Sequence, residues 1–202
     1  MKPTLEQNVD YQTAFSRIMG AAPTKGTHAT LKSAWLDTRL GPMISIADDE
    51  KLYLLEFIDR RGLEREVEQL RKKLKIAIIP GNTKIIKQIE TEITEYFDGK
   101  RNQFETPLYR LGSPFQKTVW DALCKIPAGE TRSYLDIAKS INKPTACRAV
   151  ARANGSNQLA IIIPCHRVIN SNGELGGYAG GIAKKQWLLE HEENHFTEIK
   201  RI

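Results

Sequence analysis

A cysteine and a histidine, Cys165 and His166, directly follow the longest apolar stretch of the sequence, residues 159–164. A cysteine reacts as its thiolate, so a neighbouring base or a positive electrostatic environment turns an inert thiol into a nucleophile. We interpret the apolar stretch as a buried strand with the thiol at its end, and a buried structural cysteine is the alternative. Because neighbouring side chains of a strand point to opposite faces, contact between Cys165 and His166 requires the strand to end or bend at Pro164, or a bridging water.

A catalytic histidine is oriented by a third polar group, and carboxylates near the end of the chain are candidates. The helix expected over residues 182–193 presents Glu190, Glu192 and Glu193. One of the three could fix the tautomer of His166. The spacing does not choose among them, and solvated surface charge is the alternative interpretation.

The glycine-rich segment 173–181 surrounds one aromatic side chain, Tyr178. Glycine lets the backbone approach a ligand closely. The segment lacks the Gly-Lys-Ser/Thr ending and the strand-to-helix setting of a phosphate loop, so nucleotide hydrolysis is not expected. A lid over a flat substrate fits this composition better, and a plain surface loop is the alternative.

Metal sites, disulfides and membrane spans have little support in the sequence. Cys124, Cys147 and Cys165 form neither a paired set nor a zinc-ligand spacing, and the histidines show no H-E-x-x-H pattern. We therefore expect free thiols, no metal, no cofactor and a cytoplasmic protein. No apolar run reaches the roughly 20 residues that a bilayer crossing requires. The net charge of +6 over 202 residues suits an anionic partner but is weak support for one.

The first half of the chain combines a strand pattern with two helix patterns. Residues 31–57 alternate apolar and polar side chains and predict an antiparallel meander of about three strands. Residues 64–74 and 83–97 carry apolar side chains at helical spacing. Thr83 and Gly99 suit the two ends of the second helix. Helices over a sheet make an α/β lobe.

The second half of the chain is predicted to be helical. Residues 114–123 form one apolar face and are followed by a Pro-Ala-Gly turn. Ser133 and Asp136 have the form of a capping box at the start of a second helix. Thr145 is the predicted cap of a third helix, which begins at residue 146. Two short helices around a tight turn indicate a helix-turn-helix.

Several short motifs within residues 113–192 occur together in one known family. They are Pro114-Phe115-Gln116, Val119-Trp120, Ile126-Pro127-Ala128-Gly129-Glu130-Thr131, Ser133-Tyr134, Arg148-Ala149-Val150, Asn157, Pro164-Cys165-His166-Arg167-Val168 and Gly180-Gly181. With these motifs the chain resembles the O6-alkylguanine-DNA alkyltransferase family. Residues 31–98 are similar to the more variable N-terminal lobe of that family. The pentapeptide around Cys165 is the most specific of the matches.

The resemblance implies an α+β fold of two lobes. Residues 28–105 would form an N-terminal ribonuclease-H-like α/β lobe, with a three-stranded antiparallel sheet plus helices. Residues 106–202 would form a helical, winged-helix-like DNA-binding lobe that contains the helix-turn-helix. The preceding residues, 1–27, include a segment at 10–24 that resembles the end of an arabinose-regulator-type helix-turn-helix. We interpret them as a remnant of a regulator helix or a flexible leader.

The resemblance also implies direct-reversal DNA repair. The protein would flip an O6-alkylguanine out of double-stranded DNA and transfer its methyl or other alkyl group irreversibly to Cys165, with O4-alkylthymine as a further candidate substrate. His166 would take the thiol proton through a water, and Glu192 would orient His166. Each molecule would act once, as a monomer and without a cofactor.

Other positions receive supporting roles from the same resemblance. Asn157 would brace the active-site turn, and Tyr134 would stack near the lesion and donate its hydroxyl. Arg148 would fill the gap left by the flipped nucleotide, with its helix in the minor groove. Further DNA contacts are assigned to Thr131, Ser133, Ala146, Ala149 and Ala151, and the substrate pocket to Val168, Tyr178, Ala179 and Ala160. Ala179 replaces a serine of some members and Ala160 a proline, which leaves the preferred alkyl size open.

Two other classes of function fit part of the sequence. A hydrolase with a Cys-His nucleophile would need an oxyanion hole and would turn over repeatedly. A DNA-binding regulator or alkyl-lesion sensor would use the helices within residues 133–153 and would keep its function when Cys165 is replaced. The presence of Cys165 argues against a non-repairing sensor.

Overall fold

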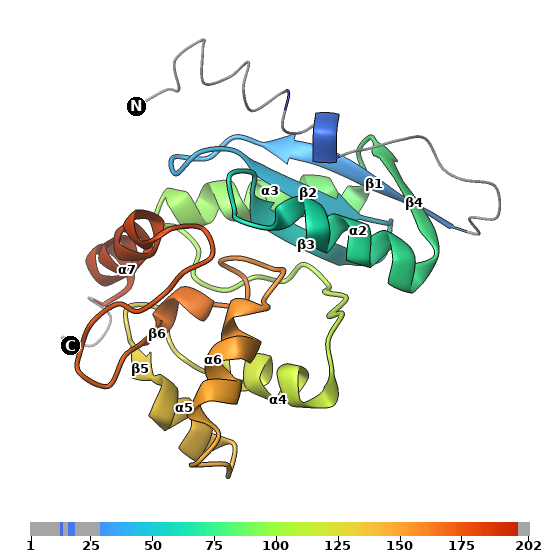
Figure 1. Ribbon diagram of the computed structural model, residues 1–202. Helices are drawn as coiled ribbons and strands as arrows, with labels where there is room; N and C mark the ends of the chain where they lie inside the picture. The colour runs from blue at the N-terminus through green and yellow to red at the C-terminus, as the bar shows by residue number, and fades with distance from the viewer. Residues whose placement is uncertain (1–12, 14–15, 19–28, 198–202) are drawn as a thin grey trace. The chain divides into compact units, whose positions relative to one another are not determined.

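The computed structural model describes residues 13, 16–18 and 29–197 (Figure 1). The regulator-like segment at 10–24 lies mostly outside these residues. The described chain divides into two compact units, which fall within Met1–Phe97 with Glu105–Leu111 and within Asp98–Phe104 with Gly112–Ile202. Across the described ranges, no helix is both long enough and apolar enough to cross a membrane.

The first unit is built on the predicted meander. Strands β1(Ala29–Leu36), β2(Met43–Ala47) and β3(Leu52–Phe57) pair antiparallel in the order of the sequence. The carboxylate of Asp48 closes the turn between β2 and β3 by accepting two backbone N–H groups. A fourth strand, β4(Ile76–Pro80), pairs parallel to β1 and gives the order β3-β2-β1-β4. The sheet therefore has one strand more than the sequence predicts.

Two helices of the first unit lie on opposite faces of this sheet (Figure 1). Helix α2(Leu63–Leu74) follows β3, and α3(Lys84–Phe97) follows β4. The apolar side of α2 closes a core with one face of the sheet, because side chains alternate along each strand. Members of this core include Leu31, Ile44, Ile46, Leu54, Leu63, Val67, Leu70, Ile76 and Ile78. The Thr83 hydroxyl accepts from the N–H of Ile86 at 3.1 Å, which confirms the predicted cap of α3.

Three short helices begin the main part of the second unit. They are α4(Pro114–Leu123), α5(Tyr134–Ser140) and α6(Cys147–Gly155). The predicted capping box is present: the Ser133 hydroxyl accepts from the N–H of Asp136, and the Asp136 carboxylate accepts from the N–H of Ser133. Helices α5 and α6 pack on each other around a tight turn, as expected for a helix-turn-helix.

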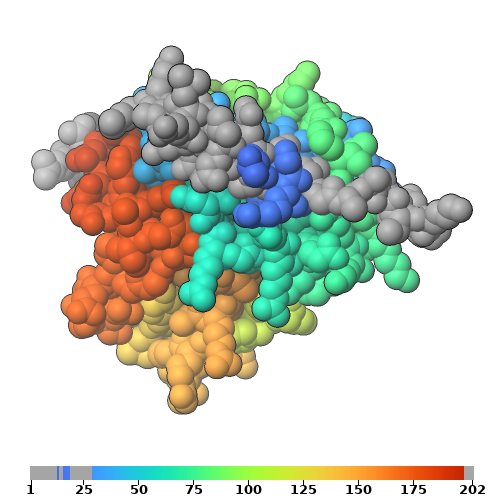
Figure 2. All heavy atoms as spheres, turned by 45° about the horizontal axis from the view of Figure 1, so that its top comes forward, coloured from blue at the N-terminus to red at the C-terminus, as the bar shows by residue number. Residues whose placement is uncertain are grey.

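Helix α6 is anchored at its C-terminal end and has no side-chain cap at its N-terminal end. The predicted cap at Thr145 is wrong, because Ala146 occupies the N-cap position and Thr145 lies one residue too early to reach the first turn. At the other end, the Trp120 indole N–H donates to the Ala153 carbonyl at 2.9 Å. The turn between α5 and α6 is exposed and protrudes from its unit (Figure 2).

The predicted strand before Cys165 is wrong, because residues 159–163 form a turn. In this turn the N–H of Ile163 donates to the Leu159 carbonyl at 3.0 Å. Ile161 has a φ of 72°, a conformation that β-branched residues rarely adopt. The apolar side chains are largely buried as predicted, and backbone hydrogen bonds within residues 159–165 close the turn.

The elements after this turn complete the second unit. The short 3-10 helix η1(Cys165–Arg167) leads into β6(Val168–Ile169), which pairs parallel to β5(Arg132–Ser133). The glycine-rich segment follows, and α7(Ile182–Phe196) is the last element of the unit among the described residues. The cysteine and the histidine singled out from the sequence are thus the first two residues of η1.

Candidate active site

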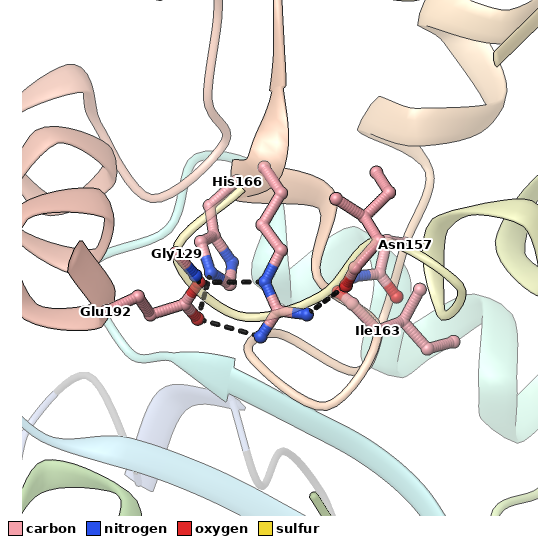
Figure 3. Close-up of polar contacts among 7 residues, drawn as sticks. Gly129, Asn157, Ile163, His166 and Glu192 are labelled. Carbon is pink, nitrogen blue, oxygen red and sulfur yellow. Dashed lines mark hydrogen bonds and ion pairs between the residues drawn. The ribbon is translucent and has the colours of Figure 1, made fainter. Parts of the chain in front are cut away.

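Cys165 is buried, with 8 % of its surface exposed. Its sulfur accepts a hydrogen bond from Nδ2 of Asn157 at 3.2 Å. The same Nδ2 donates to the carbonyl of Leu159 at 3.3 Å and to the carbonyl of Ile163 at 2.9 Å. Figure 3 shows Asn157 beside Ile163. Asn157 therefore shapes the turn and contacts the sulfur at the same time. A donor that faces the sulfur favours the thiolate over the thiol.

His166 is fully buried and contacts one of the three candidate carboxylates. Its Nε2 lies 2.8 Å from Oε1 of Glu192 (Figure 3). The other ring nitrogen, Nδ1, has no hydrogen-bond partner among the residues that the structure describes. Glu190 and Glu193 are exposed, whereas Glu192 is buried. The structure thus distinguishes three glutamates that the sequence spacing leaves equivalent.

Glu192 is the centre of a buried hydrogen-bond network. Its carboxylate accepts from Nε and Nη2 of Arg167 at 2.8 and 2.9 Å, and from the N–H of Gly129 at 3.2 Å. Arg167 also donates through Nη1 to the Ile126 carbonyl at 2.6 Å. Gly129 has a φ of 77°, and a Cβ there would lie 2.5 Å from the hydroxyl oxygen of Thr197, so this turn requires glycine.

The network fixes the protonation states of Glu192 and His166. Burial alone would raise the pKa of Glu192, but His166 and Arg167 lower that pKa below its ordinary value. Burial lowers the pKa of His166; the Glu192 carboxylate opposes this shift, and Arg167 adds to it. We therefore assign an ionised Glu192 that accepts the Nε2 proton of a neutral His166. The lone pair on Nδ1 is then available to take a proton.

Lys185 is a buried cation that the sequence does not single out. Its side chain is fully buried, and its Nζ donates to the Val168 carbonyl at 2.5 Å and to the Leu175 carbonyl. These bonds join β6 to the glycine-rich segment. Burial lowers the pKa of Lys185 to about 8, and the negative charge of Cys165 acts in the opposite direction. The interaction between this cation and a negative charge on Cys165 favours the thiolate.

Tyr134, at the start of α5, is half-buried. Its pKa is raised, first by burial and then by the negative charge of Cys165. The phenol therefore stays protonated at neutral pH and can donate a proton. The neighbouring Ser133 hydroxyl donates to the Asp136 carboxylate at 2.7 Å, and Thr131 is exposed.

Four of the residues predicted to contact DNA lie between the N-cap and the middle of α6. Arg148 and Ala149 are exposed, and Ala146 and Ala151 are partly exposed. Small side chains let another backbone approach closely, and an exposed arginine can reach beyond them. This end of the helix therefore combines a smooth surface with one long cation.

The predicted pocket residues differ in their exposure. Val168 and Ala160 are buried, whereas Ala179 is exposed. Tyr178 is half-buried and its hydroxyl oxygen is shielded from solvent. All three cysteines of the chain are free thiols, and the described part of the chain holds no cluster of three or more His, Cys, Asp or Glu side chains suited to a metal ion.

The fold and the site define a class of protein in which a buried cysteine, followed by a histidine that is paired with a buried glutamate, accompanies a helix-turn-helix. Residues 114–194 match the family described as 6-O-methylguanine DNA methyltransferase, DNA binding domain. Residues 31–109 match its ribonuclease-like domain. The chain belongs to the 6-O-methylguanine DNA methyltransferase family. The resemblance and the α+β fold inferred from the sequence are confirmed.

Curated relatives and solved structures agree with this assignment. A methylated-DNA–protein-cysteine methyltransferase of Methanosarcina barkeri is 41% identical over 161 residues, 79% of this chain and 96% of that protein. The inducible protein of the same name from Bacillus subtilis is 44% identical over 139 residues, 69% of this chain and 78% of that protein. The crystal structure of Mycobacterium tuberculosis OGT in complex with DNA aligns with a TM-score of 0.70 and 36% identity, covering 81% of this chain and 94% of that one.

Proposed function

We propose that this protein repairs DNA by direct reversal, by transferring a methyl or other alkyl group from O6-alkylguanine to Cys165. The observation that carries the proposal is the buried His166–Glu192 pair beside the cysteine, in which Nδ1 of a neutral His166 is left to accept a proton. The relatives named methylated-DNA–protein-cysteine methyltransferases support the same reaction.

In the transfer step, the Cys165 sulfur attacks the alkyl carbon, so that the S–C bond forms as the bond from that carbon to O6 breaks. The thiol proton passes through a bridging water to Nδ1 of His166. The departing guanine needs one proton, which we assign to the Tyr134 hydroxyl; the proton on His166 then replaces it. The net products are guanine and S-alkylcysteine. Lys185 stabilises the thiolate before the attack.

Each protein molecule acts once, because a thioether is not hydrolysed under ordinary conditions. When the protein is mixed with an excess of duplex DNA that contains O6-methylguanine, repair should stop at one lesion per protein molecule. Chromatography of the digested DNA measures the lesions that remain. Repair that continued beyond one equivalent would contradict the proposal and favour a hydrolase.

The DNA-binding surface we infer is the N-terminal end of α6, which enters the minor groove of double-stranded DNA. The exposed alanines allow close approach to the groove, and Arg148 fills the gap left by the flipped nucleotide. We propose that the protein acts as a monomer, because the residues assigned to the site all lie in the second unit of one chain. Its three free thiols suit the reducing cytoplasm.

Replacing Arg148 with alanine should slow repair of duplex DNA about 100-fold, because no side chain then fills the gap left by the flipped nucleotide. Reaction with free O6-methylguanine base should change less than about twofold. Arg152→Ala is the matched control, since it removes an exposed arginine one turn further along α6. Equal losses of rate with the duplex and the free base would rule out Arg148 as the residue that fills the gap.

The rate of alkyl transfer should fall as the pH is lowered through the pKa of His166, which burial places below the ordinary histidine value of 6.5. Because burial lowers the pKa of His166, the ring is neutral near pH 7 and loses its acceptor when it is protonated at lower pH. Single-turnover rates between about pH 5 and about pH 8, with folding checked by circular dichroism, test this. His166→Gln should be slower throughout but should still bind DNA. Equal single-turnover rates for the natural sequence and His166→Gln at every pH would remove His166 as the base.

A further inference from the structure

Asn154 is a buried side chain that the mechanism above does not use. It lies near the C-terminal end of α6, with 5 % of its surface exposed. Its Nδ2 donates to the carbonyl of Cys165 at 3.3 Å, whereas its Oδ1 is buried without a hydrogen-bond partner among the described residues. A fold that buries an amide with an unsatisfied acceptor is less stable than the same fold with an apolar side chain of similar size at that position. Such a group calls for an explanation, and the hydrogen bond of Asn154 is to the backbone of Cys165.

The contact of Asn154 joins the helix of the helix-turn-helix to the backbone of the reacting residue. The same end of α6 is clamped to α4, because Nε2 of Gln116 donates to the Ser156 hydroxyl at 2.7 Å and Trp120 donates to the last turn. Arg148 lies six residues earlier, about 9 Å along the helix axis. Helix α6 therefore connects the proposed DNA contact at one end to Cys165 at the other.

We propose that Asn154 is a positioning residue that holds the Cys165 sulfur at a fixed position relative to α6, the helix that we propose contacts DNA. This inference rests on the proposed function. A lesion in a duplex is held through the DNA backbone, so its position is fixed relative to α6. The sulfur must then keep a fixed position relative to the same helix. A free O6-methylguanine base is not tied to α6 and can follow the sulfur within the pocket.

The test compares alkyl transfer from duplex DNA and from the free base for Asn154→Leu. Leucine has a similar volume and removes both the donor and the unsatisfied acceptor, so the fold should be retained. We expect the rate constant with duplex DNA to fall about tenfold. The rate constant with free O6-methylguanine should change less than about twofold, and the affinity for undamaged duplex should be unchanged. Intact mass measures the methyl transfer, and Asn154→Ala provides a second variant.

The matched control is Ser156→Ala, which removes a hydrogen bond from the same end of α6. Ser156 bonds to Gln116 and to Ala153, so this variant should leave the ratio of the two rate constants unchanged. Equal losses with duplex and free base in Asn154→Leu would overturn the inference, and so would an unchanged duplex rate. If the protein with the natural sequence transferred no methyl group from either substrate, the proposed function itself would be wrong, whatever the result for Asn154→Leu.

Discussion

A Cys165→Ala protein should bind duplex DNA as tightly as the natural sequence and transfer no methyl group. The sulfur is the atom that forms the new bond, and alanine offers no nucleophile in its place. The end of α6 that we propose to contact DNA lies elsewhere in the second unit, so binding should not depend on the sulfur. Gel-shift titration gives the affinity, and intact mass after incubation with O6-methylguanine DNA gives the transfer.

Cys124→Ala is the matched control for this variant, because Cys124 is an exposed thiol at the end of α4. It should transfer one methyl group at the natural rate. Transfer that persisted in Cys165→Ala, or that disappeared in Cys124→Ala, would move the acceptor to another residue. A regulator that reads DNA without repair would show no difference among the three proteins.

Glu192→Gln should weaken the fold and slow alkyl transfer together. The substitution leaves the buried guanidinium of Arg167 without its anion, and breaking a buried ion pair costs about 3 to 5 kcal/mol. The neutral amide also no longer fixes His166 as a proton acceptor, so we expect the transfer rate to fall about 100-fold. Denaturant unfolding measures the stability. Single-turnover kinetics, at a temperature where both proteins are folded, measure the rate.

Glu193→Gln is the control, because Glu193 is the next residue of α7 and is exposed. Its stability and transfer rate should match those of the natural sequence. If Glu192→Gln lost stability but kept its rate when folded, Glu192 would be a structural residue and not a partner of His166.

The buried network has a structural meaning as well as a chemical one. Arg167 and Gly129 bring the turn after α4 to the same carboxylate that holds His166. Lys185 joins the glycine-rich segment to the strand after the cysteine. The cysteine turn is therefore held from several elements, and its strained Ile161 persists because these contacts over-determine it.

Local signals predicted much of the fold. The meander, the cap at Thr83 and the capping box at Ser133 depend on residues close in sequence, and the structure confirms them. Strand β4 was missed because its short apolar run can be a helix or a strand by periodicity alone. Its pairing with β1 bridges Ile76 and Ala29, which are far apart in the chain.

The site was predictable in its residue types but not in its geometry. The apolar run before Cys165 predicts a strand, and the amide of Asn157 turns it back on itself. Arg167 and Lys185 are basic residues, which are usually exposed, so no local signal marks them as buried. The spacing leaves the three glutamates equivalent, and the placement of α7 shows that Glu192 faces His166. The family resemblance supplied that choice from the sequence.

The most direct test of the account is intact mass and peptide mapping after incubation of the protein with duplex DNA that contains O6-methylguanine. We predict the addition of one methyl group per molecule, located on the peptide that carries Cys165, together with restored guanine in the DNA. An unchanged mass with DNA still bound, or a methyl group on Cys124 or Cys147, would contradict it.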